Sequence, residues 1–204
     1  MNQKFFSTVM LVVCLVVLSS VEVFGQQQRR RSGGLDNLSL PSTGASIASS
    51  SWQKFAPEGA GFSVMMPGLP DENSKEVGPG AANLKAYRFK TGETEYVVGV
   101  LLDFPAELLQ SPDFRAKYFE VVPHMMMRAQ EYASRNYKLS SQRNISINDH
   151  PGRQYKLDSA DYTCTMRVVL TDRSIYIMSV ESARATLSPE NVEKFLASFT
   201  LEEN

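Results

Sequence analysis

The chain has 204 residues, of which 43% are hydrophobic, and its 21 basic and 22 acidic side chains leave a formal net charge of −1. That balance argues against nucleic-acid binding, because proteins that bind the phosphate backbone carry a clustered excess of lysine and arginine. The 150 residues from Trp52 to Leu201 are enough for one self-sufficient domain, which at this size buries roughly 70% of its unfolded surface.

The first 25 residues have the order of a secretory signal peptide. Lys4 precedes an apolar run from Phe5 to Leu18, and small and polar residues then lead to Gly25. We therefore expect cleavage between Gly25 and Gln26, and a secreted or periplasmic protein without a transmembrane helix. A retained N-terminal membrane anchor is the alternative, although the run is shorter than the about 20 apolar residues of a spanning helix. Cleavage leaves Cys164 as the only cysteine, so no intramolecular disulfide is expected.

The composition along the chain divides it into four segments. After the signal peptide of residues 1–25, residues 26–51 are rich in glutamine, arginine, serine and glycine, a composition that buries too little apolar area to fold. We predict a disordered linker over 26–51, a single α+β domain over 52–201 and a tail over 202–204.

Alternating polar and apolar residues predict strands over most of the domain. The run from Tyr96 to Leu102 is continuously apolar and is expected in the middle of a sheet, buried on both faces. Thr200 and Leu201 are assigned to a short tail after the last helix. The expected strands are 52–55, 62–67, 72–77, 84–90, 93–103, 137–147, 153–157, 162–170 and 175–180.

Two helices are expected, each starting with a serine cap, a proline and an acidic residue. The first begins at Ser111 and carries an apolar stripe from Phe114 to Tyr132, and Pro123 is expected to kink it or divide it in two. The second begins at Ser188. Strands outnumber helices and hairpins outnumber crossovers, so the predicted class is α+β, an antiparallel β-sheet with covering helices.

Four short motifs occur in order along the domain: Phe62–Pro67, the turn Asn148–Arg153, Arg173–Met178 and Phe195–Phe199. Together they resemble the motifs of secreted bacterial domains of the PsbP/Mog1-like fold family. The resemblance spans Trp52 to Leu201 and implies an α/β/α sandwich. It also implies an accessory or partner-binding role, since the named relatives do not act through a shared catalytic site. Relatives often carry an acidic residue after the arginine of the turn, where this chain has Gln154.

No set of residues in the sequence has the pattern of a catalytic site. Only His124 and His150 could act as an imidazole base, and His150 precedes Pro151 in an expected turn over Asn148 to Gly152. Cys164 alternates with apolar residues and is expected to be buried and inert. Two distant histidines and one cysteine do not supply a zinc site. We therefore predict no catalytic residue, no metal and no cofactor.

The segment His124–Met127 offers thioethers that suit Cu(I), which makes a copper-handling protein one alternative. Neighbouring helical residues are about 100° apart, however, so three adjacent methionines cannot face one ion together. The simpler expectation is that Met125 fills the core and that the other side chains are partly exposed.

Arg153 and His150 are the two candidate binding residues. A guanidinium fixed after a Pro-Gly turn could clamp a carboxylate or a phosphate. The structural alternative pairs Arg153 with Asp149 or Asp161 and packs its stem on Tyr155.

The leading interpretation is an exported, non-enzymatic accessory or binding module of the cell envelope, with an envelope protein or a small ligand as partner. A hydrolase whose site is assembled from residues distant in sequence is the alternative, and copper handling is the third.

Overall fold

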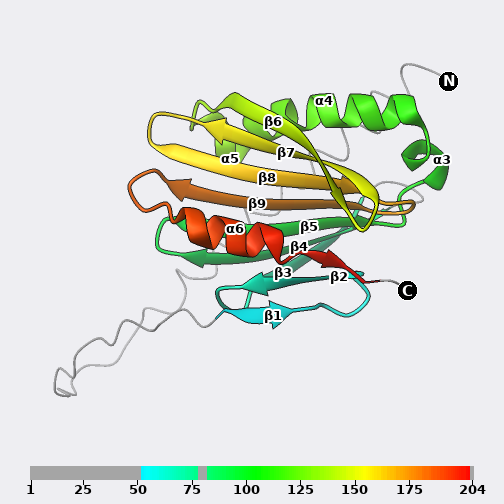
Figure 1. Cartoon of the computed structure of the whole chain (residues 1–204), viewed down its shortest axis with the longest axis horizontal. Helices are drawn as coiled ribbons and strands as arrows, with labels where there is room; N and C mark the ends of the chain where they lie inside the picture. Colours follow the sequence, from blue (N-terminus) through cyan, green and yellow to red (C-terminus); the bar gives the residue numbers. More distant parts are fainter. Residues whose placement is uncertain (1–51, 78–81, 203–204) are drawn as a thin grey trace, which may run out of the picture.

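The computed structural model describes residues 52–77 and 82–202 (Figure 1). The expected signal peptide and linker, and residues 203–204 of the expected tail, lie outside the described residues. None of the described helices is long and apolar enough to cross a membrane.

A seven-stranded antiparallel sheet forms the centre of the fold, in the order β3-β4-β5-β9-β8-β7-β6. The expected hairpins are present, and the pairing of β5 with β9 joins the early hairpins to the later meander. Both of these strands lie inside the sheet, as the continuous apolar run in β5 predicts. The strands are β3 (Asp71–Val77), β4 (Ala82–Thr91), β5 (Thr94–Leu102), β6 (Lys138–Ile147), β7 (His150–Asp158), β8 (Tyr162–Leu170) and β9 (Ile175–Ala183).

The helices are α3 (Ala106–Leu109), α4 (Pro112–Arg128), α5 (Gln130–Ala133) and α6 (Pro189–Ala197). α4 packs on one face of the sheet and α6 on the other, and each helix contributes to a separate apolar core. Ser111 and Ser188 cap α4 and α6 as predicted, since their hydroxyls accept from Phe114 N at 3.3 Å and Asn191 N at 3.2 Å. The sheet covered by helices confirms the predicted α+β class.

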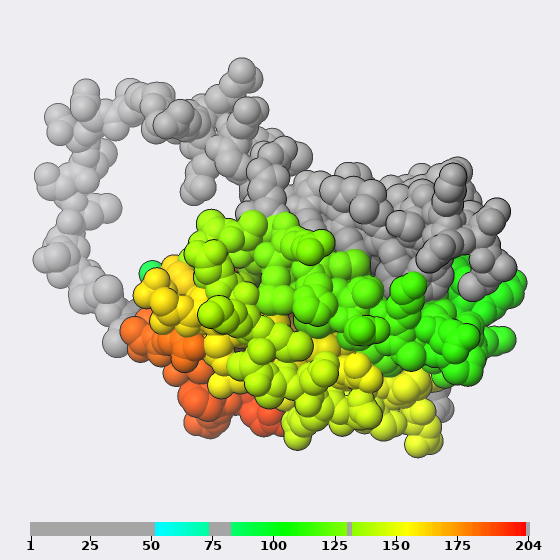
Figure 2. All heavy atoms as spheres, turned by 90° about the horizontal axis from the view of Figure 1, so that it is seen from above, coloured from blue at the N-terminus to red at the C-terminus, as the bar shows by residue number. Residues whose placement is uncertain are grey.

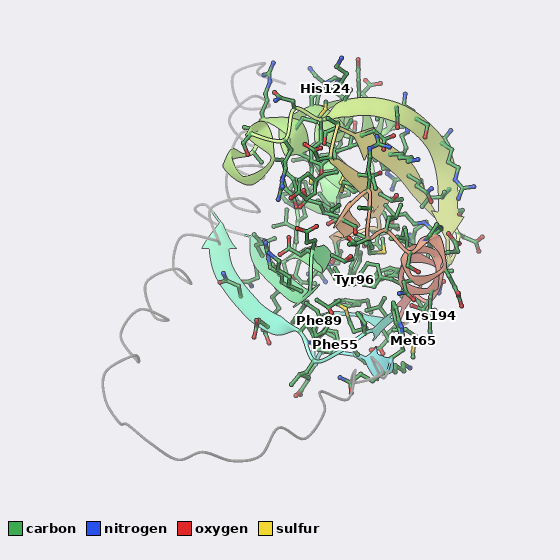
Figure 3. All side chains as sticks on the ribbon, turned by 90° about the vertical axis from the view of Figure 1, so that its left-hand side faces the viewer. Phe55, Met65, Phe89, Tyr96, His124 and Lys194 are labelled. Carbon is green, nitrogen blue, oxygen red and sulfur yellow. The ribbon has the colours of Figure 1, made fainter. Side chains whose placement is uncertain are left out.

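A second, three-stranded sheet shares the α6 face of the main sheet. It consists of β1 (Gln53–Phe55), β2 (Phe62–Met66) and β10 (Thr200–Leu201), in the order β1-β2-β10. The assignment of Thr200–Leu201 to a tail is wrong, because Thr200 pairs with Ser63 and their hydroxyl oxygens lie 2.9 Å apart. Figure 3 shows Phe55 and Tyr96 between this sheet and the main one, with His124 on the far side of the molecule.

Pro123 does not divide α4, which runs unbroken from Pro112 to Arg128. A proline inside a helix leaves the carbonyl four residues earlier without its usual N–H donor. Here that carbonyl belongs to Phe119, and it accepts a hydrogen bond from the hydroxyl of Tyr155, a fully buried residue of β7. A strand of the sheet therefore satisfies the carbonyl that the proline leaves free, and this contact fixes α4 on the sheet.

Candidate binding surface

The β6–β7 hairpin turns through Asn148 and Asp149 alone, with φ of 48° and 60°. Two consecutive left-handed residues make a type I′ turn, which suits the twist of the flanking strands and which Asn and Asp tolerate. The predicted turn over Asn148 to Gly152 is therefore too long, because His150 to Gly152 belong to β7. Pro151 fits at the strand start because the pairing of β7 with β8 begins only at Gly152.

His150 lies at the end of this hairpin, half-buried and opposite Ile147. Its backbone carbonyl accepts from Ser146 Oγ at 3.3 Å. Within residues 52–77 and 82–202, no group of three or more His, Cys, Asp or Glu side chains is arranged to hold a metal ion. The structure thus places His150 beside the edge strand β6 and not in a cluster of ionisable groups.

Arg153 is half-buried on β7, on the α4 side of the sheet. Its Nε donates to Asn144 Oδ1 of β6 at 3.1 Å, and its guanidinium carbon lies 5.2 Å from the centre of the Phe119 ring. These contacts differ from the expected pairs with Asp149 or Asp161. The type I′ turn is so short that Arg153 lies opposite Asn144 in the ladder, and the reach of its side chain brings it to α4.

Arg167 on β8 is a residue of this surface that sequence reasoning missed. It is only 9% exposed, and it donates through Nη1 to the Leu196 carbonyl of α6 at 2.7 Å and through Nε to Gln154 Oε1 at 2.8 Å. Burial lowers the pKa of Arg167, and the nearby Glu193 carboxylate, 3.4 Å away, opposes that shift. Gln154 also accepts from Arg143 Nη2 at 3.2 Å, so one amide joins an exposed and a buried guanidinium. The one available signal was the alternation that places Arg167 on the same face of β8 as the threonines.

β6 forms one edge of the main sheet and pairs on one side only among the described residues. Seven of its ten residues are exposed and none is fully buried. In Figure 2 the green atoms of α4 and the yellow-green atoms of β6 both lie on the visible surface. Lys138 and Arg143 of β6 have no ion-pair partner among the described residues, which gives this edge a basic character.

A second group of ionisable side chains lies on the α4 face, around Glu181 of β9. The buried carboxylate of Glu181 accepts from the Tyr137 hydroxyl at 2.7 Å and lies 3.4 Å from Arg135 Nε. Arg135 also stacks on Tyr162, with 3.5 Å from its guanidinium carbon to the ring centre. Burial raises the pKa of Glu181, Tyr137 and Arg135 oppose the rise, and the Glu95 carboxylate adds to it. These contacts tie the segment after α5 to β8 and β9, so we assign the group a structural role.

Cys164 is fully buried directly opposite Glu181, as its alternation with apolar residues predicts. Burial and, secondarily, the Glu181 charge raise the pKa of this thiol well above its usual range. Met126 is the buried methionine of α4, whereas Met125 and Met127 are partly buried and His124 is exposed. Met125 packs against the core as expected but only partly buried, and the expected partial exposure of Met126 is wrong, because the face of α4 that carries Val122 and Met126 is the one that meets the sheet.

Comparison with known proteins gives a likeness of fold. No protein-family model matches the chain, and no curated protein matches it. The solution structure of cyanobacterial PsbP (CyanoP) from Synechocystis is similar with a TM-score of 0.55 and 13% identity, over 79% of this chain and 98% of that chain. This likeness confirms the PsbP-like fold.

Two other solved structures are less similar. A protein from Bacteroides thetaiotaomicron matches with a TM-score of 0.37 and 14% identity, over 75% of this chain and 49% of that one. A protein of unknown function from Pseudomonas aeruginosa, described as a putative regulator, matches with a TM-score of 0.33 and 14% identity, over 66% and 84%. At these TM-scores neither of the two contributes to the argument.

Proposed function

We propose that this chain is an exported, non-enzymatic accessory module of the cell envelope that binds a partner protein through the β6–β7 edge of its main sheet. The observation that carries the proposal is the open edge strand β6, ten residues long and paired on one side only among the described residues. Unpaired N–H and C=O groups on such an edge are a template for pairing with another chain. An exposed sheet edge of this kind can serve for recognition when an extended segment of a partner adds to it as a further strand.

The PsbP-like fold supports the accessory part of the proposal. The resemblance of this chain to the PsbP/Mog1-like domains implies proteins that serve as subunits or bind partners. The two residues that the sequence singled out also favour this edge, since His150 and Arg153 both lie on β7 and contact β6. The N-terminal segment with signal-peptide character supports export to the envelope.

Site-specific photo-crosslinking in the source cells tests the proposal with the full chain. A photoreactive phenylalanine derivative replaces the exposed Ser141 or Arg143 of β6, and in the matched control it replaces the exposed Glu190 of α6, a helix that packs on β9 and β2. We expect discrete adducts with an envelope protein from the β6 positions and none from Glu190. Adducts of equal yield at all three positions, or none at β6, would overturn the assignment of the binding surface.

A further inference from the structure

The open edge of β6 presents its backbone groups at defined residues. In a type I′ hairpin the residues that flank the turn, Ile147 and His150, form a hydrogen-bonded pair, and antiparallel pairs then alternate. The N–H and C=O groups of Ser146, Asn144 and Gln142 therefore point away from β7. All three residues are exposed. Beyond the irregularity between Leu139 and Ser141, the strand offers three consecutive outward-facing sites.

Two basic side chains of β6, Lys138 and Arg143, have no ion-pair partner among the described residues. Lys138 and Arg143 both point to the α6 side of the sheet, where they lie opposite Asp158 and Gln154 in the ladder. Asp158 is engaged by Arg184 at 3.1 Å and by Lys156 at 3.9 Å, and Gln154 is neutral. Two positive charges on one side of an open strand are therefore left for an incoming chain.

This charge decides between two possible occupants of the edge. A second copy of the chain would bring its own basic β6 beside this one, and like charges directly opposite each other destabilise a strand pair. A strand with carboxylates on its α6-facing side would instead place opposite charges beside Lys138 and Arg143. Charge complementarity thus favours an acidic partner strand.

We propose that β6 accepts an extended acidic segment of the partner protein as an eighth strand of the main sheet. The inference rests on the proposed function and specifies the class of partner. Backbone hydrogen bonds to Gln142, Asn144 and Ser146 hold the segment, and carboxylates at alternate positions select it through Lys138 and Arg143. The hydrogen bonds give affinity and the alternate side chains give specificity, as in other cases of strand addition.

The test uses the full chain and an eight-residue peptide of alternating threonine and glutamate, with a threonine–glutamine peptide as its matched control. Backbone amide exchange is followed residue by residue by NMR. At saturation with the glutamate peptide, exchange at Gln142, Asn144 and Ser146 should slow by about tenfold or more, because these amides acquire partners. Exchange at Arg143 and Ile145, whose amides already face β7, should stay unchanged. The glutamine peptide should bind at least about fivefold more weakly than the glutamate peptide. Arg143→Gln should weaken binding of the glutamate peptide about two- to fivefold.

Two blocking experiments isolate the backbone contacts. Ser146→Pro removes an outward N–H without removing a bond to β7, and should abolish protection, whereas Ser146→Ala should retain it. Methylation of alternate peptide nitrogens leaves the protein unaltered, and only one of the two alternating sets should block binding.

If the glutamate peptide binds but exchange at the three outward amides does not slow, strand addition is overturned. Crosslinks from β6 in cells would in that case still support the proposed function. Equal affinity for the two peptides would overturn the acidic class of partner. Concentration-dependent protection of the same amides without peptide, together with a dimer in sedimentation, would show that a second copy occupies the edge. Protection by the peptide with no crosslink from β6 in cells would overturn the proposed function alone.

Discussion

The hydrogen bond from Tyr155 to the Phe119 carbonyl should depend on Pro123. Tyr155→Phe removes a hydroxyl that is fully buried and leaves the carbonyl of Phe119 without a donor, since a proline at position 123 has no N–H to offer. Pro123→Ala restores that N–H within the same helix. Loss of the tyrosine hydroxyl should therefore lower the free energy of unfolding strongly in the native sequence and only slightly in the Pro123→Ala variant.

The expected magnitude follows from what each variant leaves unpaired. A buried acceptor without a partner costs about 1–3 kcal/mol, so Tyr155→Phe should lower the free energy of unfolding by that amount. In the Pro123→Ala background the helix supplies a donor, and the same change should cost about 0.5 kcal/mol or less, because only one of two donors is lost. The difference between the two costs is the coupling energy of the cycle, and we expect about 1 kcal/mol or more.

Urea unfolding of the native protein, the two single variants and the double variant gives the four free energies of the cycle. Arg153→Gln serves as the matched control, since Arg153 also reaches α4 but does not contact the Phe119 carbonyl. The change in unfolding free energy that Arg153→Gln causes should simply add to the change caused by Pro123→Ala. If Tyr155→Phe costs the same in both backgrounds, the hydroxyl does not replace the missing helical donor and the reasoning fails.

Four other buried contacts of the sheet give further tests. Burial raises the folded pKa of Glu181 above 4.5, so the contribution of its protonated form to the free energy of unfolding is present below that pH and is lost as pH rises. Tyr137→Phe removes the hydrogen bond that stabilises the Glu181 carboxylate. In urea unfolding this variant should therefore lose about 1.5–3 kcal/mol of unfolding free energy at pH 7 and less at pH 4. Arg167→Met should cost about 1–3 kcal/mol in the same assay, because a carbonyl at the end of α6 loses its donor. Gly152→Ala should lower the melting temperature, since the added Cβ would lie 2.7 Å from a backbone oxygen of β8. Cys164 should stay unlabelled by a thiol reagent until the protein unfolds, as peptide mapping would show.

Local signals predicted the elements well. The serine–proline starts of α4 and α6 were identified because the capping hydroxyl and the backbone N–H that donates to it lie three residues apart. The alternation in β8 placed Cys164 on a buried face, since side chains of a strand point to opposite faces in turn. Each of these inferences needed only neighbours along the chain.

The predictions that failed depend on partners distant in sequence. Thr200–Leu201 is too short to show an alternation, and only its pairing with β2, 137 residues earlier, makes it a strand. Of the two outcomes expected at Pro123, a kink or a division, the structure excludes the division, and the donor to the Phe119 carbonyl comes from Tyr155 of another element. The role of Arg167 likewise depends on a carbonyl of α6 that lies 29 residues later. No periodicity within a window of ten or fifteen residues carries this information.

The pairing of β2 with β10 has a consequence for how the chain folds. Because Ser63 meets Thr200, the three-stranded sheet cannot close until the chain is available as far as β10. Contacts of such large sequence separation are slow to form, because the chain loses the entropy of loop closure before the contacts can stabilise it. A chain that emerges N-terminus first during synthesis would therefore lack the complete three-stranded sheet until β10 has emerged. The strand β10 thus delays completion of the native fold, although it is only two residues long.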